Sequence, residues 1–202
     1  MPVGTEYSRA VPHIWHKKFV ELPLNGNMGV GIAEASQQGT QCPGSVWGLV
    51  FAPKAVRNYT SWNMPVPGDW DGTSSLVFRY QWCQRVAGDE KDAICIWTLH
   101  HWACQDWDNI LGSKYVTQHA THTYGDEGTT NFCMHCGTFE LDLTGGTYGT
   151  LSSGHTLFLD FGMPQGVSGA ATALLFRASV EYMARFVGPS DTIPTTTNKE
   201  GG

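Results

Sequence analysis

Large apolar side chains recur at every second position through the second half of the chain. In SLVFRYQWCQRV (75–86), one face of an extended segment carries Leu76, Phe78, Tyr80 and Trp82. Helical spacing would scatter these four side chains around the axis, so the pattern predicts a strand. ATALLFRASVEYMARF (171–186) repeats the period, and we expect one uninterrupted alternation there. The positions expected on its apolar face are Leu174, Phe176, Ala178, Val180 and Tyr182.

Other short apolar segments complete a series of strands. They are SVWGLVFAPKAV, AICIWTLHHWAC, TFELDL and HTLFLDF, and glycine-containing turns separate them. We expect AICIWTLHHWAC (93–104) to be the hairpin partner of residues 75–86, across the turn AGDEKD. Many short strands with scarcely a helical segment predict an all-β fold, an antiparallel, jelly-roll-like β-sandwich.

Three regions follow from this pattern. Residues 1–45 are rich in glycine and poor in bulky side chains, and we expect an irregular N-terminal arm in which HIWHKKFVELPL makes one strand or a short amphipathic turn. Residues 46–187 hold the sandwich. Residues 188–202 are polar and rich in threonine, which predicts a flexible tail.

Composition excludes several classes of partner. The formal net charge of −6 argues against an electrostatic grip on nucleic acid, and no run approaches the roughly twenty apolar residues that a membrane span needs. The six cysteines follow no disulfide framework, so we expect most of them to be reduced, as in a cytosol. Cys83 and Cys95 fall within expected strands and act there as small apolar side chains.

One segment has the spacing of a metal site. FCMHCGT (132–138) places Cys133 and Cys136 three apart, and His119 and His122 stand close enough in sequence to complete four zinc ligands. The alternative is a strand, in which Met134 and Cys136 share one face while Cys133 and His135 share the other. We favour the strand and expect no cofactor, with zinc as the alternative.

An Asp-Trp-Asp core occurs twice, in GDWDG (68–72) and QDWDN (105–109). An exposed indole beside carboxylates can stack on a sugar ring while the acids bond its hydroxyls. The candidate ligand-binding residues are Trp70, Asp71, Trp107 and Asp108. The alternative is that each indole folds back and caps the end of the sandwich.

No arrangement of residues points to an enzyme. LHHWACQDWDN (99–109) gathers histidines and aspartates, but the chain has no Gly-x-Ser-x-Gly elbow, no framed carboxylate pair and no phosphate loop. We therefore expect no catalytic residues. Adjacent histidines on opposite faces of a strand end explain the segment more simply.

Residues from about 61 to 186 resemble a jelly-roll-like domain of tailed-phage virion proteins. The resemblance lies in PGDWDGTSSLVFRYQW, AICIWTL, GHTLFLDF and LLFRASVEYM, whereas DFGMPQGVSGA lacks the Arg-Asp segment that usually ends such domains. It implies a non-enzymatic capsid decoration or cement subunit, or a domain of a fibre. Its partners would be the major capsid protein and its own copies, typically as a trimer, in virions made in a host cytoplasm.

Two functions therefore remain after the sequence is considered. The virion role needs contact surfaces, and the tryptophans expected in loops or near strand ends are its interface anchors. These are Trp15, Trp47, Trp62, Trp70 and Trp107. The rival is a glycan-binding β-sandwich module that uses the Asp-Trp-Asp segments.

Overall fold

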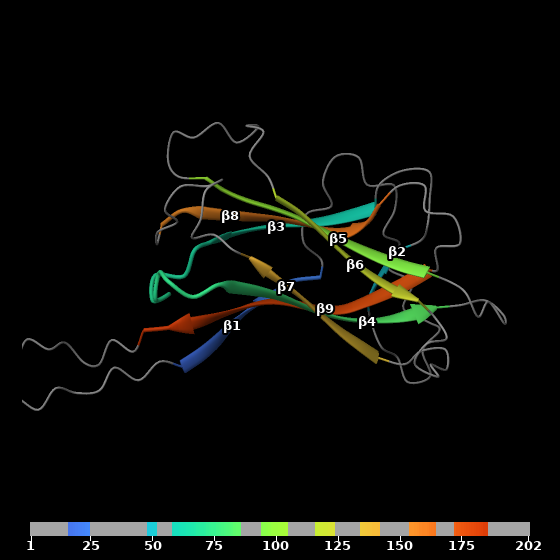
Figure 1. Cartoon of the computed structure of the whole chain (residues 1–202), viewed down its shortest axis with the longest axis horizontal. Helices are drawn as coiled ribbons and strands as arrows, with labels where there is room; N and C mark the ends of the chain where they lie inside the picture. Colours follow the sequence, from blue (N-terminus) through green and yellow to red (C-terminus); the bar gives the residue numbers. More distant parts are fainter. Residues whose placement is uncertain are drawn as a thin grey trace, which may run out of the picture.

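The described residues form nine β-strands in two antiparallel sheets (Figure 1). The computed structural model describes residues 16–24, 48–51, 58–85, 94–104, 116–123, 134–141, 154–164 and 172–185. The strands are β1 (His16–Leu22), β2 (Leu49–Phe51), β3 (Asn58–Pro65), β4 (Leu76–Arg85), β5 (Ile94–Cys104), β6 (Val116–Thr123), β7 (Met134–Leu141), β8 (Thr156–Met163) and β9 (Thr172–Ala184). No described residue is helical, and the described part of the chain holds no helix able to cross a membrane.

The two sheets face each other as the layers of a jelly-roll-like β-sandwich, as the sequence predicts (Figure 1). Sheet A has the order β1-β9-β4-β7, with β2 also paired to β9, and sheet B has the order β3-β8-β5-β6. The predicted hairpin of residues 75–86 with 93–104 is wrong. β4 pairs with β7 and β9, while β5 lies in the other sheet beside β6 and β8. Periodicity shows which face of a strand is buried but not which strand lies beside it.

The core lies between the sheets and is rich in aromatic rings. Phe78, Tyr80 and Trp82 of β4 are buried, as the two-residue period predicts. They meet Trp97 of β5 and Phe161 of β8, whose rings stack with centroids 4.7 Å apart. Tyr80 lies 4.8 Å from the ring of Phe161 and Trp82 lies 5.6 Å from that of Trp97, so β4 joins the two layers.

A β-bulge interrupts the alternation in β9. Gln81 of β4 is opposite Arg177, but the next residue, Trp82, is opposite Leu175, so Phe176 is the extra residue. Because one inserted residue exchanges the two faces of a strand, Leu175 points into the core while Leu174 packs outside it, with Val50 and Cys83. The expected single alternation is correct for Ala178, Val180 and Tyr182 and wrong for Leu174 and Phe176.

The first strand of sheet A lies within the expected N-terminal arm. Residues 16–22 pair with residues 178–184 of β9 throughout β1, so the sheet begins well before the predicted boundary at residue 46. Of the two alternatives for HIWHKKFVELPL, the strand is correct. The sequence pattern also missed β3 and β6, where polar and apolar residues do not alternate cleanly. Residues 1–15 and 25–45 of the arm and the tail 188–202 lie outside the described residues.

The described cysteines lie in strands and are free thiols. Cys83, Cys95, Cys104 and Cys136 form no disulfide, and the first two are buried as expected. Burial raises the pKa of the Cys95 thiol, so this side chain stays neutral and packs as an apolar group. Cys42 and Cys133 lie outside the described residues.

We predict that Gly137→Ala destabilises the fold. Gly137 of β7 is opposite Tyr80 of β4, and a Cβ at this position would come 2.1 Å from Cζ of that buried ring. Overpacking of this kind costs about 1–3 kcal/mol in the free energy of unfolding, measured by urea titration. Gly68→Ala is the matched control, since its Cβ would meet nothing within 4 Å. Equal stabilities for the two variants would contradict the close approach of ring and backbone.

Candidate functional site

Trp70 belongs to the core, so the structure does not provide the exposed indole that the GDWDG motif predicts. The residue is only 8% exposed, and its indole N–H donates a 3.0 Å hydrogen bond to the carbonyl of Ser74. Its backbone forms an isolated bridge with Ala184 of β9. The capping alternative is therefore the correct one for Trp70. Trp107 and Asp108 of the second motif lie outside the described residues.

The carboxylates beside Trp70 hold the loop rather than a ligand. Asp71 accepts hydrogen bonds from the backbone N–H groups of Thr73 and Ser74, at 2.9 and 2.8 Å, and from the Ser74 hydroxyl. Asp69 accepts hydrogen bonds from Lys18 of β1 and from the Tyr182 hydroxyl of β9. The two aspartates thus stabilise the turn and tie it to sheet A.

Trp62 is likewise unavailable as an interface anchor. It is buried in the core, and its indole N–H donates a 2.8 Å hydrogen bond to the carbonyl of Pro23. Trp15 and Trp47, which the virion interpretation also used, lie outside the described residues.

The three candidate zinc ligands that the structure describes do not meet. His119 is exposed on the outer face of β6 in sheet B, whereas Cys136 is exposed on the outer face of β7 in sheet A. His122 points between the sheets, where its ring lies 5.1 Å from that of Trp82. Cys133 lies outside the described residues, among which no group of three or more His, Cys, Asp or Glu side chains is placed to hold a metal ion.

The strand alternative for residues 132–138 holds in the described part. Met134 and Cys136 are exposed on one face of β7, and His135 on the other face stacks on Trp82 at 4.8 Å. The adjacent histidines of β5 also separate as expected. His101 is buried, which lowers its pKa to about 4, whereas His100 on the outer face contacts Tyr59 and Thr117.

A groove lies on the outer face of sheet A, where the sequence reasoning placed no function. Its volume is about 460 Å³, and strands β1, β4 and β9 form it. Ser179 of β9 is opposite Glu21 of β1 on one side and Arg79 of β4 on the other. Because serine is small and its neighbours are long, the sheet surface is hollow at this point. The lining residues are Lys17, Phe19, Arg79, Gln81, Arg177, Ser179 and Glu181.

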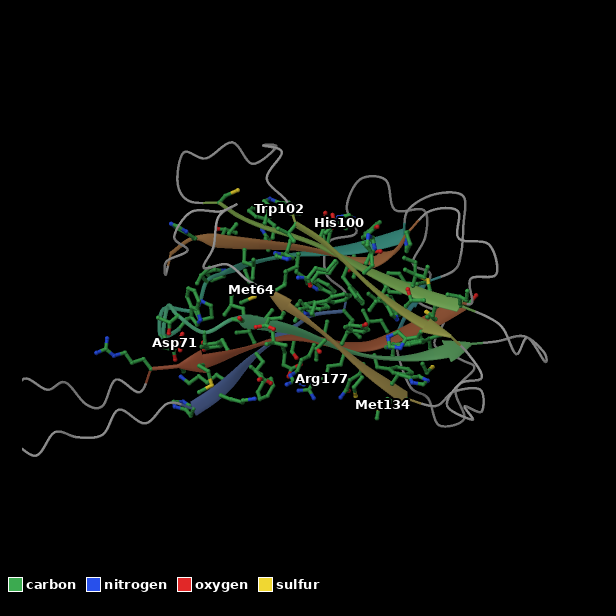
Figure 2. The ribbon with its side chains drawn as sticks, in the orientation of Figure 1. Met64, Asp71, His100, Trp102, Met134 and Arg177 are labelled. Carbon is green, nitrogen blue, oxygen red and sulfur yellow. The ribbon has the colours of Figure 1, made fainter. Side chains whose placement is uncertain are left out.

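Figure 2 shows Arg177 on the outer side of sheet A, on the same side as Met134. His100 and Trp102 lie on the outer side of sheet B, at the opposite surface of the sandwich. The groove is thus separated from His100 and Trp102 by the whole core.

Phe19 is the large apolar side chain of the groove. It is 53% exposed, although phenylalanine usually contributes to a core, and it is opposite Glu181 in the register of β1 with β9. The other strongly exposed apolar residue among those described is Met134, which is 64% exposed and lies outside the groove.

A network of ion pairs fixes the polar side chains of the groove. Glu181 forms a 2.9 Å salt bridge with Lys17 and accepts a 2.6 Å hydrogen bond from Nε of Arg79. The hydrogen bond from Lys17 is the largest cause of a lowered Glu181 pKa, and Arg79 lowers it further, against the opposing effect of burial. Arg177 holds Glu21 through two N–H groups, and its hydrogen bond lowers the pKa of Glu21.

A weak signal for this groove was present in the sequence. The strand pattern already separates Arg79 and Gln81 from the apolar face of β4, and Arg177, Ser179 and Glu181 from that of β9. Such residues on the outer face of a strand are usually a solvated surface. Only the pairing of β9 between β1 and β4 brings them to the same place as Phe19.

Comparisons with known proteins give structural neighbours only. No protein-family model and no curated protein matches the chain. Among solved structures, the chain is similar to a xylan-binding module, CBM15, at 13% identity over 83% of this chain and 97% of that chain, with a TM-score of 0.47.

Two further solved structures are similar at lower scores. The CBM36-1 domain of a multidomain xylanase from the hindgut metagenome of Trinervitermes trinervoides has 10% identity over 82% of this chain and 96% of that chain, with a TM-score of 0.42. A carbohydrate-binding module CBM36 in complex with calcium and xylotriose has 11% identity over 83% and 99%, with a TM-score of 0.40. Likenesses of this level carry no argument about the ligand of this chain. None of the three is a virion protein, so they give the predicted virion resemblance no support beyond the sandwich itself.

We predict that Trp70→Ala lowers stability by about 3 kcal/mol, because it removes a buried indole from the end of the core. Guanidinium unfolding measures the loss. If the variant kept its stability but no longer bound a saccharide, the result would contradict a core role for Trp70 and support the exposed indole that the motif predicts.

We predict that Glu181→Gln costs about 1 kcal/mol at pH 7, since the carboxylate holds two partly exposed cations. The pKa of Glu181 is lowered in the folded protein, so its stabilisation is present above the ordinary value of 4.5 and is lost as the pH falls through the lowered pKa. The difference between variant and wild type should therefore vanish in acid unfolding measurements below that pKa. Glu140→Gln, at an exposed carboxylate of β7, is the control and should change stability little at pH 7. A pH-independent difference for Glu181→Gln would show that the ion pairs are not its cause.

Proposed function

We propose that the protein is a saccharide-binding β-sandwich module and that its ligand lies in the groove on the outer face of sheet A. The observation that carries this proposal is Phe19, a half-exposed aromatic ring placed beside fixed polar side chains in a groove of about 460 Å³. Binding pockets for small ligands commonly have volumes of about 300–1,000 Å³, so one or a few sugar units would fit.

Sugar rings have two kinds of surface, and the groove offers a partner for each. The C–H groups of a pyranose form an apolar face, which packs on an aromatic ring such as that of Phe19. The hydroxyls at the ring edge need planar donors and acceptors, and Arg79 and Gln81 of β4 supply these. An aromatic platform and planar polar groups on one surface are the combination that saccharide recognition needs.

The polar groups are held in place before any ligand arrives. Arg79 donates to Glu181 through Nε, which leaves its two terminal amino groups without a hydrogen bond to any described residue. Because the side chain is already oriented, less conformational entropy is lost when a ligand binds. The strands beneath the groove add rigidity, since β9 pairs with β1 on one side and with β4 on the other.

The lining supports binding rather than catalysis. Glycoside hydrolysis uses two carboxyl groups that flank the scissile bond, one of them able to donate a proton. Glu181 is the single carboxylate among the described lining residues, and two cations stabilise its charged form. A carboxylate held in this way is a poor general acid. We therefore propose a module without enzymatic activity of its own.

The virion role stays a prediction. The buried positions of Trp62 and Trp70 remove two of its proposed interface anchors. Attachment to a major capsid protein, a trimer of this chain and a location in virions are expectations from the resemblance alone. A glycan-binding module of a tail fibre or adhesin would unite both interpretations.

We predict that Phe19→Ala weakens saccharide binding at least tenfold, which corresponds to about 1.4 kcal/mol. The measurement is affinity electrophoresis of the full chain against a panel of soluble polysaccharides, followed by calorimetry on those that retard it. Phe19→Trp should retain binding, because the ring face remains. The unfolding free energy should change little, since the side chain is half exposed.

Met134→Ala is the matched control, because it truncates another strongly exposed apolar residue on the same face but outside the groove. It should leave the affinity unchanged. Equal losses in both variants, or no retardation by any polysaccharide, would refute the groove as a saccharide site.

A further inference from the structure

The charge of the groove is opposite to that of the whole protein. The chain has 12 basic and 18 acidic residues and a net charge of −6. The groove lining has three cations, Lys17, Arg79 and Arg177, against one carboxylate, Glu181, which gives a net charge of +2. Counting Glu21 as well, which pairs with Arg177 from beside the lining, still leaves +1. A basic groove in an acidic protein favours an anionic ligand through electrostatic complementarity.

The cations of the groove are accessible, whereas its carboxylate is covered. The side chains of Lys17, Arg79 and Arg177 are 61%, 43% and 53% exposed. The side chain of Glu181 is 8% exposed and lies beneath two of these cations. An approaching ligand therefore meets ammonium and guanidinium groups before it meets the negative charge that they neutralise.

The two arginines are diagonal neighbours on adjacent strands. Arg79 of β4 is opposite Ser179 of β9, and Arg177 stands two residues before that serine, opposite Gln81. Diagonal pairs across a sheet lie about 7–8 Å apart, and their long side chains reach the same ligand. A guanidinium has five N–H donors in a fork that matches a carboxylate. In its hydrogen bonds to described residues, Arg79 donates only from Nε.

We infer that the saccharide bound in the groove is acidic and that Arg79 and Arg177 hold the carboxylate of a uronic acid unit. This inference rests on the proposed function and specifies the class of its ligand. Phe19 packs on the sugar ring, while the guanidinium groups bind the carboxylate at its edge. Glu21 competes for Arg177, because its own carboxylate already occupies two of the N–H groups.

The test compares polymers that differ only in charge. The full chain is titrated by calorimetry with polygalacturonate, alginate and hyaluronan, and with the carboxyl-reduced or methyl-esterified form of each. We expect at least tenfold tighter binding to one or more uronate polymers than to its neutral form, weakening as salt is added. Dextran sulfate is included to separate carboxylate from sulfate recognition.

Variants assign the effect to the two arginines. Arg79→Gln and Arg177→Gln should each remove most of the preference for the charged polymer, and Arg79→Lys should restore only part of it, because lysine lacks the planar fork. Glu21→Gln should tighten uronate binding severalfold by releasing Arg177, an effect that a purely structural role would not produce. Thermal unfolding of each variant confirms that it is folded.

The outcomes separate the inference from the proposed function. Equal affinity for charged and neutral polymers, still dependent on Phe19, would overturn the uronate inference and leave the saccharide site intact. Equal or tighter binding of dextran sulfate would overturn the carboxylate assignment. Binding to none of the polysaccharides would refute the proposed function together with the inference.

Discussion

The packing of β9 between β1 and β4 is the constraint on which both the core and the groove depend. On one face of β9, Val180 and Tyr182 enter the core, and on the other Ser179 and Glu181 form the bottom of the groove. Since successive residues of a strand point to opposite faces, a residue that follows a core position in this part of β9 faces the groove. Arg177 keeps the phase of Ser179 and Glu181, and the bulge at Phe176 reverses the phase only for the residues that precede it.

Electrostatics in the groove follow from the same pairing. β1 contributes Lys17 and Glu21, β4 contributes Arg79, and β9 contributes Glu181 and Arg177, so each ion pair crosses from one strand to another. Pairs with partly exposed cations contribute about 1 kcal/mol or less to stability, and we attribute to these mainly a positioning role. They hold guanidinium and ammonium groups around an aromatic ring, in a protein whose overall charge is negative. That local reversal of charge is the reason to expect an acidic saccharide.

The motifs that stand out in the sequence have structural explanations. In GDWDG, Trp70 closes the core and Asp71 organises a turn, because an indole is large enough to cap a sandwich and a short carboxylate reaches its own backbone. The zinc hypothesis combined Cys136 with His119. These two residues lie on opposite surfaces of the sandwich. Spacing along a strand indicates only which face a side chain is on, whereas a metal site needs ligand side chains that come together in space.

Two-residue periodicity was sufficient to establish an antiparallel β-sandwich and the buried faces of β4 and of most of β9, since burial follows directly from the apolar character of each position. It could not identify strand partners, the bulge or the membership of β1 in sheet A, because these depend on contacts between residues far apart in the chain, such as Val20 with Val180 and Trp82 with Leu175. The groove belongs to this second kind of feature. In the sequence, nothing distinguishes Phe19, Arg79 and Glu181 from residues of an ordinary strand surface. They line one groove only because β1, β4 and β9 lie side by side in the folded sheet.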